Sequence, residues 1–147
     1  MENYDGLFEN NNAEPFDKGK WVEQKREEHK AVYQMIDDAA IAAVSSGKQF
    51  QVFLNVQARF DRYSVSNVLL IAHQFPEATR LADFNTWKKE GVYIKKGEST
   101  INLLEPGKEY TTPDGRIKTS YNVKKVFDVS QTTALQKRET SVSHDKR

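Results

Sequence analysis

The sequence predicts an α+β domain in which three to four helices pack on a small antiparallel sheet. Apolar residues recur at helical spacing from about residue 20 to residue 90, and after residue 91 the pattern changes to the alternation of extended strands. Helices that precede strands, rather than alternate with them, are typical of helices gathered on one face of an antiparallel sheet. A chain of 147 residues fits one such domain.

The first two helices are predicted before residue 63. The first runs from about Lys20 to Ser46, and Gly47 is placed to end it because glycine accepts the left-handed conformation that often follows a helix. The second runs from Gln49 to about Arg62. Their apolar stripes comprise Val22, Tyr33, Ile36, Ala40 and Val44 in the first helix and Phe50, Phe53, Leu54 and Phe60 in the second.

Two more helices are predicted before the pattern changes. The third begins near Ser64 and ends before Pro76, which lacks an N–H group and disfavours helix in the preceding residue. A short fourth helix runs from Asp83 to Glu90, because the Asp83 carboxylate can accept hydrogen bonds from the free N–H groups of the first turn. Gly91 is placed to end this helix.

The remaining elements are predicted as short strands. Val92–Ile94 and Ile101–Leu104 are the first two candidates. Thr112–Gly115 is a turn signal, since proline presets φ, aspartate bonds locally and glycine accepts a left-handed conformation. We expect that turn to join the two arms of a hairpin. The last strand alternates apolar and polar residues and contains Tyr121, Val123, Phe127 and Val129.

Polar ends flank the predicted domain. Residues 1–17 are predicted to form a disordered acidic tail, residues 18–132 the folded domain, and residues 133–147 a polar tail or a truncated linker. Charge is divided unevenly, because residues 1–47 carry five Lys and Arg against ten Asp and Glu, whereas residues 48–147 carry seventeen against eleven. The balance of +6 in the longer part can attract polyanions.

Composition excludes several kinds of protein and site. The chain has no cysteine, which excludes disulfides, thiolate metal sites and cysteine nucleophiles. Its longest apolar runs are too short to cross a bilayer, and no signal peptide opens the sequence. We therefore expect a cytoplasmic protein that does not span a membrane.

Tyr63-Ser64-x-x-Asn67 stands at the start of the third predicted helix. In a structural interpretation Ser64 is the N-cap, and its hydroxyl accepts from a backbone N–H near Asn67. In a functional interpretation the free N–H groups and the helix dipole attract a phosphate, the Asn67 amide helps to hold it, and Tyr63 stacks on a base. The two interpretations are compatible, because a cap can orient a binding site.

Trp87 and the lysines near it also allow two interpretations. A tryptophan in a small domain is more often a core residue than a contact residue. A partly open ring would instead offer a base a stacking platform, with Lys88 and Lys89 directly after it. Lys95-Lys96-Gly97-Glu98 indicates a tight turn, which is either solvated or a flexible clamp for phosphates.

We expect these positive side chains and open rings to converge on one concave strip wide enough for an unpaired polynucleotide. Lys125 would share a strand face with Tyr121 and Val123, whereas Lys124 would point the other way unless the strand carries a bulge. The predicted nucleic-acid-binding residues are Tyr63, Ser64, Asn67, Trp87, Lys88, Lys89, Tyr93, Lys95, Lys96, Arg116, Lys118, Lys125 and Gln131.

Taken in order, several short motifs resemble the N-terminal domain of the ArdC antirestriction family, which also heads LtrC-like proteins of conjugative elements. The resemblance covers roughly residues 20–132. It implies a module that binds single-stranded DNA with little sequence preference in conjugative transfer, where other conjugation or antirestriction proteins are further partners. The motifs are Tyr63-Ser64-x-x-Asn67-x-Leu69-Leu70, Pro76 with Ala78-Thr79, Phe84-x-x-Trp87 with Gly91, Lys96-Gly97-Glu98, and Phe127-Asp128-x-x-Gln131-Thr132.

The sequence departs from larger members of that family, which continue into a zinc-dependent, metalloprotease-like domain. It has no His-Glu-x-x-His motif, and His29, His73 and His144 are not paired at ligand spacing. It also has neither a phosphate-binding glycine loop nor a Gly-x-Ser-x-Gly motif. We therefore expect no enzymatic activity, no metal and no cofactor in this chain.

Three alternatives remain at this point. One is a winged-helix-like binder of double-stranded DNA, with three helices followed by a basic hairpin at Arg116–Lys118. Another is a protein-docking module of the transfer machinery, whose acidic N-terminal helix is the contact surface. The third is an enzyme that depends on a partner or on a downstream domain.

Overall fold

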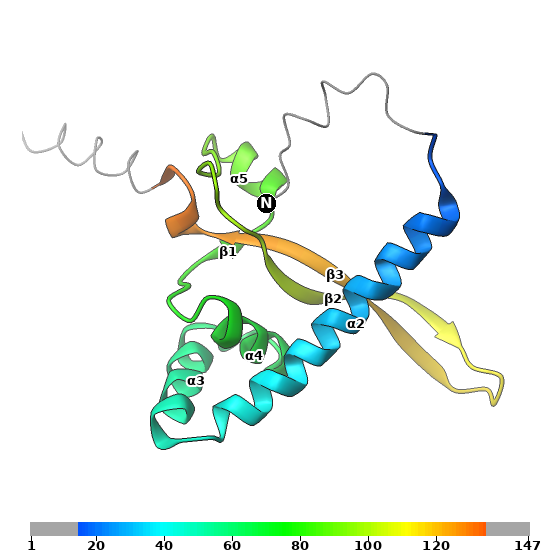
Figure 1. Ribbon diagram of the computed structural model, residues 1–147, viewed down its shortest axis with the longest axis horizontal. Coiled ribbons are helices and arrows are strands. Elements are labelled where there is room, and N and C mark those ends of the chain that lie inside the picture. The colour runs from blue at the N-terminus through cyan, green and yellow to red at the C-terminus, as the bar shows by residue number, and fades with distance from the viewer. Residues whose placement is uncertain (1–14, 135–147) are drawn as a thin grey trace, which may run out of the picture.

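Four helices and a three-stranded antiparallel sheet make up residues 15–134, the part of the chain that the computed structural model describes (Figure 1). The predicted α+β fold class is confirmed. Residues 1–14 and 135–147, which hold most of the two predicted tails, lie outside the described residues. The elements in chain order are α2 (Lys18–Ala43), α3 (Gly47–Arg59), α4 (Val65–Gln74), β1 (Leu81–Ala82), α5 (Phe84–Lys89), β2 (Ile101–Thr111), β3 (Ile117–Asp128) and the 3-10 turn η1 (Val129–Gln131).

Each of these four helices begins at a serine or aspartate N-cap. The side chain of the cap accepts a hydrogen bond from the backbone N–H three residues later, which satisfies one of the donors that a helix start leaves free. The predicted caps Ser64 and Asp83 are confirmed, at 3.2 Å to Asn67 N and 2.8 Å to Thr86 N. Gly47 does not end the first helix as predicted, since α2 stops at Ala43 and Gly47 is the first residue of α3.

The β2–β3 hairpin is the longest feature of the sheet. Thr112–Gly115 forms its turn as predicted, with Gly115 at φ 85 and its N–H 2.9 Å from Thr112 O. β1 pairs with the far end of β3, so the strand order is β1-β3-β2. The predicted strand Val92–Ile94 is wrong, because this segment contributes only an isolated bridge between Ile94 and Thr132.

A bulge interrupts β2 between Pro106 and Glu109. Gly107 sits there against the other strand, and a Cβ atom on it would lie 2.7 Å from Ser120 Oγ and 2.9 Å from Asn122 Nδ2. A side chain at this position would therefore require the Ser120 and Asn122 side chains to move. Bulges of this kind bend a strand pair and increase its twist.

Two apolar clusters hold the elements together. The larger joins α2, α3 and α4 to the sheet around Val68, Leu70 and Ile71, all of which are fully buried. The smaller surrounds Trp87 and Phe127 at the β1 end of the sheet. Trp87 also donates a hydrogen bond from Nε1 to Phe127 O at 3.0 Å, so its polar atom is satisfied inside the core.

Two side-chain amides of α4 pair with the outer edge of β2. Asn67 accepts from Leu104 N and donates to Leu104 O, both at 2.9 Å. Gln74, seven residues later on the same helix, forms the same pair of 2.9 Å bonds with Asn102. The two amides satisfy backbone groups that an edge strand would otherwise present to solvent or to another chain.

The Phe127–Thr132 segment folds into a hydrogen-bonded corner. One oxygen of the buried Asp128 carboxylate accepts from Thr79 N and Arg80 N at 2.9 and 3.0 Å, and the other accepts from Ser130 N and Oγ at 3.0 and 2.6 Å. Gln131 completes a capping box by accepting from Asp128 N at 2.8 Å. The corner therefore ties the end of β3 to the segment that leads into β1.

Replacing Asp128 with asparagine should lower the free energy of unfolding by about 2–3 kcal/mol. The amide nitrogen is a donor, and it would face either Ser130 or the Thr79–Arg80 backbone, which also donate. Urea unfolding measures this change. Asp37→Asn, on an exposed part of α2, is the matched control and should stay within about 0.5 kcal/mol of wild type.

The same carboxylate gives the prediction a pH dependence. Burial raises the pKa of Asp128, but the hydrogen bonds from Ser130, Arg80 and Thr79 outweigh it and leave the pKa below its usual value. This contribution to stability is therefore present above the unfolded-state pKa of about 3.9 and is lost as pH falls through the folded-state value. Wild type and Asp128→Asn should converge in stability on acidification, and a constant difference would contradict the assignment.

Gln74→Ala should cost about 1–3 kcal/mol of stability, because the N–H and C=O groups of Asn102 lose their partners. Urea unfolding compared with Gln24→Ala, at an exposed position of α2, checks this expectation. Equal losses in the two variants would show that the amide pairs do not stabilise the edge of β2.

Candidate nucleic-acid interface

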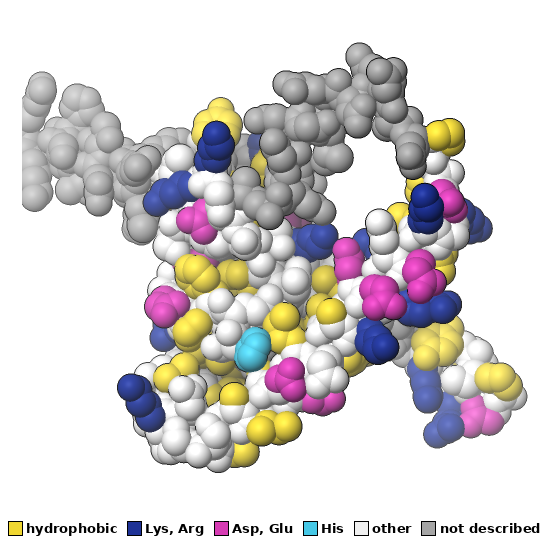
Figure 2. Space-filling model, in the orientation of Figure 1, with side chains coloured by type: hydrophobic (Ala, Val, Ile, Leu, Met, Phe, Trp, Pro, Cys, Tyr) yellow, Lys and Arg dark blue, Asp and Glu magenta, His cyan; other side chains and the backbone are white. Residues whose placement is uncertain are grey.

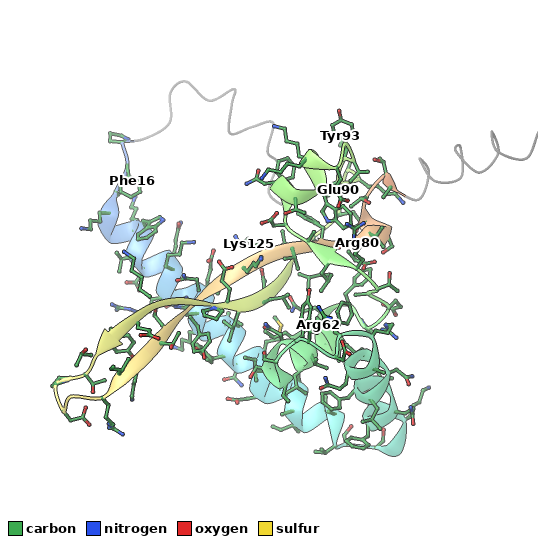
Figure 3. The ribbon with its side chains drawn as sticks, turned by 180° about the vertical axis from the view of Figure 1, so that it is seen from behind. Phe16, Arg62, Arg80, Glu90, Tyr93 and Lys125 are labelled. Carbon is green, nitrogen blue, oxygen red and sulfur yellow. The ribbon has the colours of Figure 1, made fainter. Side chains whose placement is uncertain are left out.

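A groove of about 690 Å³ opens between the helices and the middle of the β2–β3 hairpin. Its walls come from α2, from the turn into α4, from β1 and from both strands of the hairpin. Figure 3 shows Arg62 beside that turn, seen from behind. The residues that line the groove are Tyr33, Arg62, Tyr63, Ser64, Ser66, Asn67, Leu81, Ala82, Leu103, Leu104, Glu105, Pro106, Tyr121, Lys124 and Val126.

Three tyrosines from distant parts of the chain line this groove. Tyr33 and Tyr121 are 47% and 44% exposed, so each ring offers open surface. Tyr63 is partly buried and packs edge-on against Phe60 at 5.1 Å between ring centroids. Burial raises the pKa of Tyr63, so its hydroxyl is neutral at physiological pH and does not repel a phosphate.

The groove carries two cations and one carboxylate. Lys124 Nζ lies 3.8 Å from the Glu105 carboxylate, with both side chains nearly half exposed, so the pair is weak and can open. Arg62 is exposed and forms no hydrogen bond or ion pair with another of residues 15–134. The first turn of α4 adds backbone N–H groups that have no partner within the helix. These groups together can hold one or two phosphates.

The thirteen predicted contact residues do not converge on this groove, and the expectation of one concave strip is wrong. Only Tyr63, Ser64 and Asn67 line it, and the Asn67 amide is already engaged by Leu104. Figure 2 shows lysine and arginine side chains in several separate groups rather than in one band on the visible face.

Seven of the other predicted residues lie at opposite ends of β3. Lys88, Lys89, Tyr93, Lys95 and Lys96 belong to α5 and the loop after it, beside the C-terminal end of the strand, whereas Arg116 and Lys118 lie at the hairpin turn (Figure 1). The length of the strand separates the two groups by about 35 Å. They therefore cannot contact the same few nucleotides.

The last three predicted residues are engaged in the fold. Lys125 faces α2, where its Nζ lies 3.4 Å from the Glu28 carboxylate. Trp87 is fully buried, and the guanidinium of Arg80 stacks 4.9 Å from its ring centroid. Gln131 is also buried and donates to Ser99 O at 2.8 Å. The structure exposes no face of Trp87 on which a base could stack.

Sequence reasoning missed Tyr33, Arg62, Tyr121 and Lys124 as groove residues. Arg62 carried a local signal, because it directly precedes Tyr63 at the turn into α4. Tyr33 and Tyr121 are 88 positions apart in the sequence, and only the packing of α2 against β3 brings them to one groove. Lys124 lines the groove together with Tyr121, although regular strand alternation would place these two residues on opposite faces.

A comparison with known proteins identifies the family of this chain. The family model described as the N-terminal domain of anti-restriction factor ArdC matches residues 27–143, which is most of the sequence. The chain belongs to the ArdC N-terminal domain family. The resemblance seen in the sequence motifs is thereby confirmed.

The comparisons add one relative to this ArdC N-terminal domain. An uncharacterized protein of Bacillus anthracis is 32% identical over 87 residues, which cover 59% of this chain but only 15% of the relative. The aligned part is thus a small fraction of a much longer protein. No solved structure matches the chain.

Between residues 15 and 134, no helix has the length and hydropathy needed to span a bilayer. The same residues contain no group of three or more histidine, aspartate or glutamate side chains that could hold a metal ion.

The motifs that carry the resemblance to ArdC mainly hold the fold. Asn67 pairs with the edge of β2, Trp87 fills the smaller core cluster, and Asp128 and Gln131 build the corner after β3. A polar residue in a motif is therefore weak support for a contact with nucleic acid in this domain. Exposed residues outside the motifs, such as Arg62 and Tyr121, make up the open surface of the groove.

Trp87→Phe should lower the free energy of unfolding by about 1–3 kcal/mol, because it removes the bond to Phe127 O and leaves a small cavity. The other tryptophan of the chain is the control. Trp21 is 47% exposed, so Trp21→Phe should be nearly neutral in the same urea titration. A stable Trp87→Phe variant with weakened oligonucleotide binding would show that the ring is a contact rather than a core residue.

Proposed function

We propose that this domain binds single-stranded DNA, with little dependence on base sequence, in the groove beside the start of α4. The observation that carries the proposal is the grouping of three tyrosines, Arg62 and Lys124 around that groove. Aromatic side chains accept any base, since every base has a flat face, and stacking is typically worth about 1–3 kcal/mol per base. Duplex DNA keeps its bases stacked on one another, so such rings favour an unpaired strand.

The charge of the groove is modest, which sets an expectation for the salt dependence. For single strands each neutralised phosphate contributes about 0.7 to the slope of log affinity against log salt, so two cations give a slope of about −1.4. Binding should therefore depend more on stacking than on charge. This distinguishes the groove from a surface that holds polyanions through many lysines.

The proposed role is binding rather than catalysis. Glu105 is the one carboxylate among the groove's lining residues, and it pairs with Lys124 instead of with a base or nucleophile. A bound single strand in the bacterial cytoplasm would be shielded from nucleases, which fits an antirestriction role during conjugative transfer. In a longer protein the same groove would bring an attached domain to the strand.

Tyr121→Ala should weaken binding of a labelled single-stranded oligonucleotide by roughly 5- to 100-fold, the equivalent of one lost stacking contact. Fluorescence anisotropy at two ionic strengths measures this change. Tyr93→Ala is the matched control, because Tyr93 is 72% exposed but lies at the α5 end (Figure 3). If Tyr93→Ala loses more affinity for the oligonucleotide than Tyr121→Ala, the binding site lies at α5 and the lysines around it instead of in the groove.

The same titration tests the charge of the groove. Arg62→Ala should reduce the salt slope by about 0.7, because one phosphate contact is lost. Lys18→Ala, at the exposed start of α2, should leave the slope unchanged. If wild type has no salt-dependent affinity for single-stranded DNA, the domain is better explained as a protein-docking module.

A further inference from the structure

The outer half of the β2–β3 hairpin extends beyond the helices. We define residues 106–121 as the distal ribbon; Figure 1 shows it projecting from the rest of the domain. Every residue from 108 to 118 is exposed except Thr112, so neither face of this part is covered by the described domain. A two-stranded hairpin is marginally stable by itself, and an uncovered one gains stability from whatever binds it.

The base of the distal ribbon is part of the groove. Pro106 and Tyr121 are opposite each other across the two strands, and both line the groove. A nucleic acid strand that occupies the groove would therefore leave it along the ribbon. Gly107 and the bulge follow directly, so the ribbon bends away at the point where the strand would emerge.

The distal ribbon carries three cations against two carboxylates, beside the exposed side chains of Tyr110 and Ile117. Lys108 and Lys118 are exposed and have no ion-pair partner among residues 15–134. Arg116 Nε bonds Asp114 at 2.7 Å, but both side chains are more than half exposed, so this pair is weak and the outer guanidinium nitrogens remain open. Glu109 and Asp114 are the two carboxylates opposing these three cations within residues 106–121.

The shape of the ribbon fits a duplex better than a single strand. A two-stranded β-ribbon has the width to enter the major groove of B-DNA. Apart from Tyr121, the only aromatic ring among residues 106–121 is that of Tyr110, which is 49% exposed. An unpaired strand would thus find few stacking surfaces there, whereas the phosphates that flank a duplex groove can reach the cations.

We propose that the distal ribbon binds duplex DNA next to the single strand held in the groove, so that the preferred ligand is a single strand joined to a duplex. This inference rests on the proposed function of the groove. Three cations are too few to hold a duplex tightly alone. Once the groove holds the attached strand, the duplex is present at a high effective concentration, and weak contacts then add to the affinity.

The test compares four labelled ligands by fluorescence anisotropy at one salt concentration. They are a single strand of about 12 nucleotides, a duplex of about ten base pairs, the two joined as a tailed duplex, and a single strand as long as the tailed duplex. The tailed duplex should bind about tenfold more tightly than its tail alone. Two tailed duplexes are made, one with the tail at each end of the duplex strand. A higher affinity for either one than for the tail alone supports the proposal.

Arg116→Ala combined with Lys118→Ala should remove most of the gain in affinity that the tailed duplex shows over its tail alone. The same double variant should change the affinity for the short single strand less than about twofold. Lys18→Ala combined with Lys20→Ala, at the exposed start of α2, is the matched control and should keep the increase. Gly107→Ala, whose new methyl group would meet Ser120 Oγ, is a second test of the ribbon's shape. It should also reduce the gain in affinity of the tailed duplex over its tail. Urea unfolding confirms that each variant is folded.

Several outcomes would overturn the proposal, and they separate it from the function of the groove. If the long single strand binds as tightly as the tailed duplex, the ribbon does not recognise a duplex. If the duplex alone binds as tightly as the tailed one, the groove is not needed and the domain is a double-strand binder. If the short single strand does not bind at all, the proposed function of the groove fails. If the short single strand binds and the tailed duplex binds no more tightly, only the ribbon proposal fails.

Discussion

The pairing of α4 with the edge of β2 is the constraint on which the groove depends. Asn67 and Gln74 are two helical turns apart, a rise of about 10.5 Å, whereas Asn102 and Leu104 are two strand residues apart, about 6.7 Å. The longer glutamine side chain helps to span this difference. Because both amides bond in both directions, they fix the position and the rotation of α4 against the hairpin, and the turn at Ser64 is thereby held beside β2.

The other end of the hairpin is fixed by a different device. At the Asp128 corner one carboxylate receives four hydrogen bonds, and Gln131 links the corner to the loop before β2 through Ser99 O. The buried Asp128 and Gln131 side chains both have hydrogen-bond partners, which is the condition under which buried polar groups stabilise a fold. The hairpin is thus held along its inner half and at its end, and its outer half is left uncovered.

Local signals in the sequence were sufficient for most of the elements but not for their arrangement. Ser64, Asp83 and the Thr112–Gly115 turn act through their own backbone neighbourhood, so each could be predicted from a few residues. The strand predicted at Val92–Ile94 failed because its partner is a single residue, Thr132, at the far end of the chain. Strand pairing of that kind depends on tertiary contacts that local propensity does not contain.

The candidate site was harder to predict for the same reason. Lysines are visible in a sequence, but whether they share a surface depends on which end of β3 each one occupies. Tyr63 and Ser64 line the groove because the helix start places them locally. Trp87 illustrates the opposite case, since its neighbours Lys88 and Lys89 are exposed while the ring itself points into the core. Helical geometry turns adjacent residues to different faces, and the sequence alone does not say which face is covered.

The modest charge of each surface has a consequence for how the domain would hold DNA. The whole chain has a net charge of +1, and neither the groove nor the distal ribbon carries more than three cations. A single weakly charged surface gives low affinity at physiological salt, where phosphate contacts are screened. Two such surfaces joined at Pro106 and Tyr121 can act on one ligand, because the second contact forms within an existing complex and costs less entropy. The proposed selectivity for a strand joined to a duplex would then arise from the geometry that connects the surfaces, without a requirement for strong charge on either one.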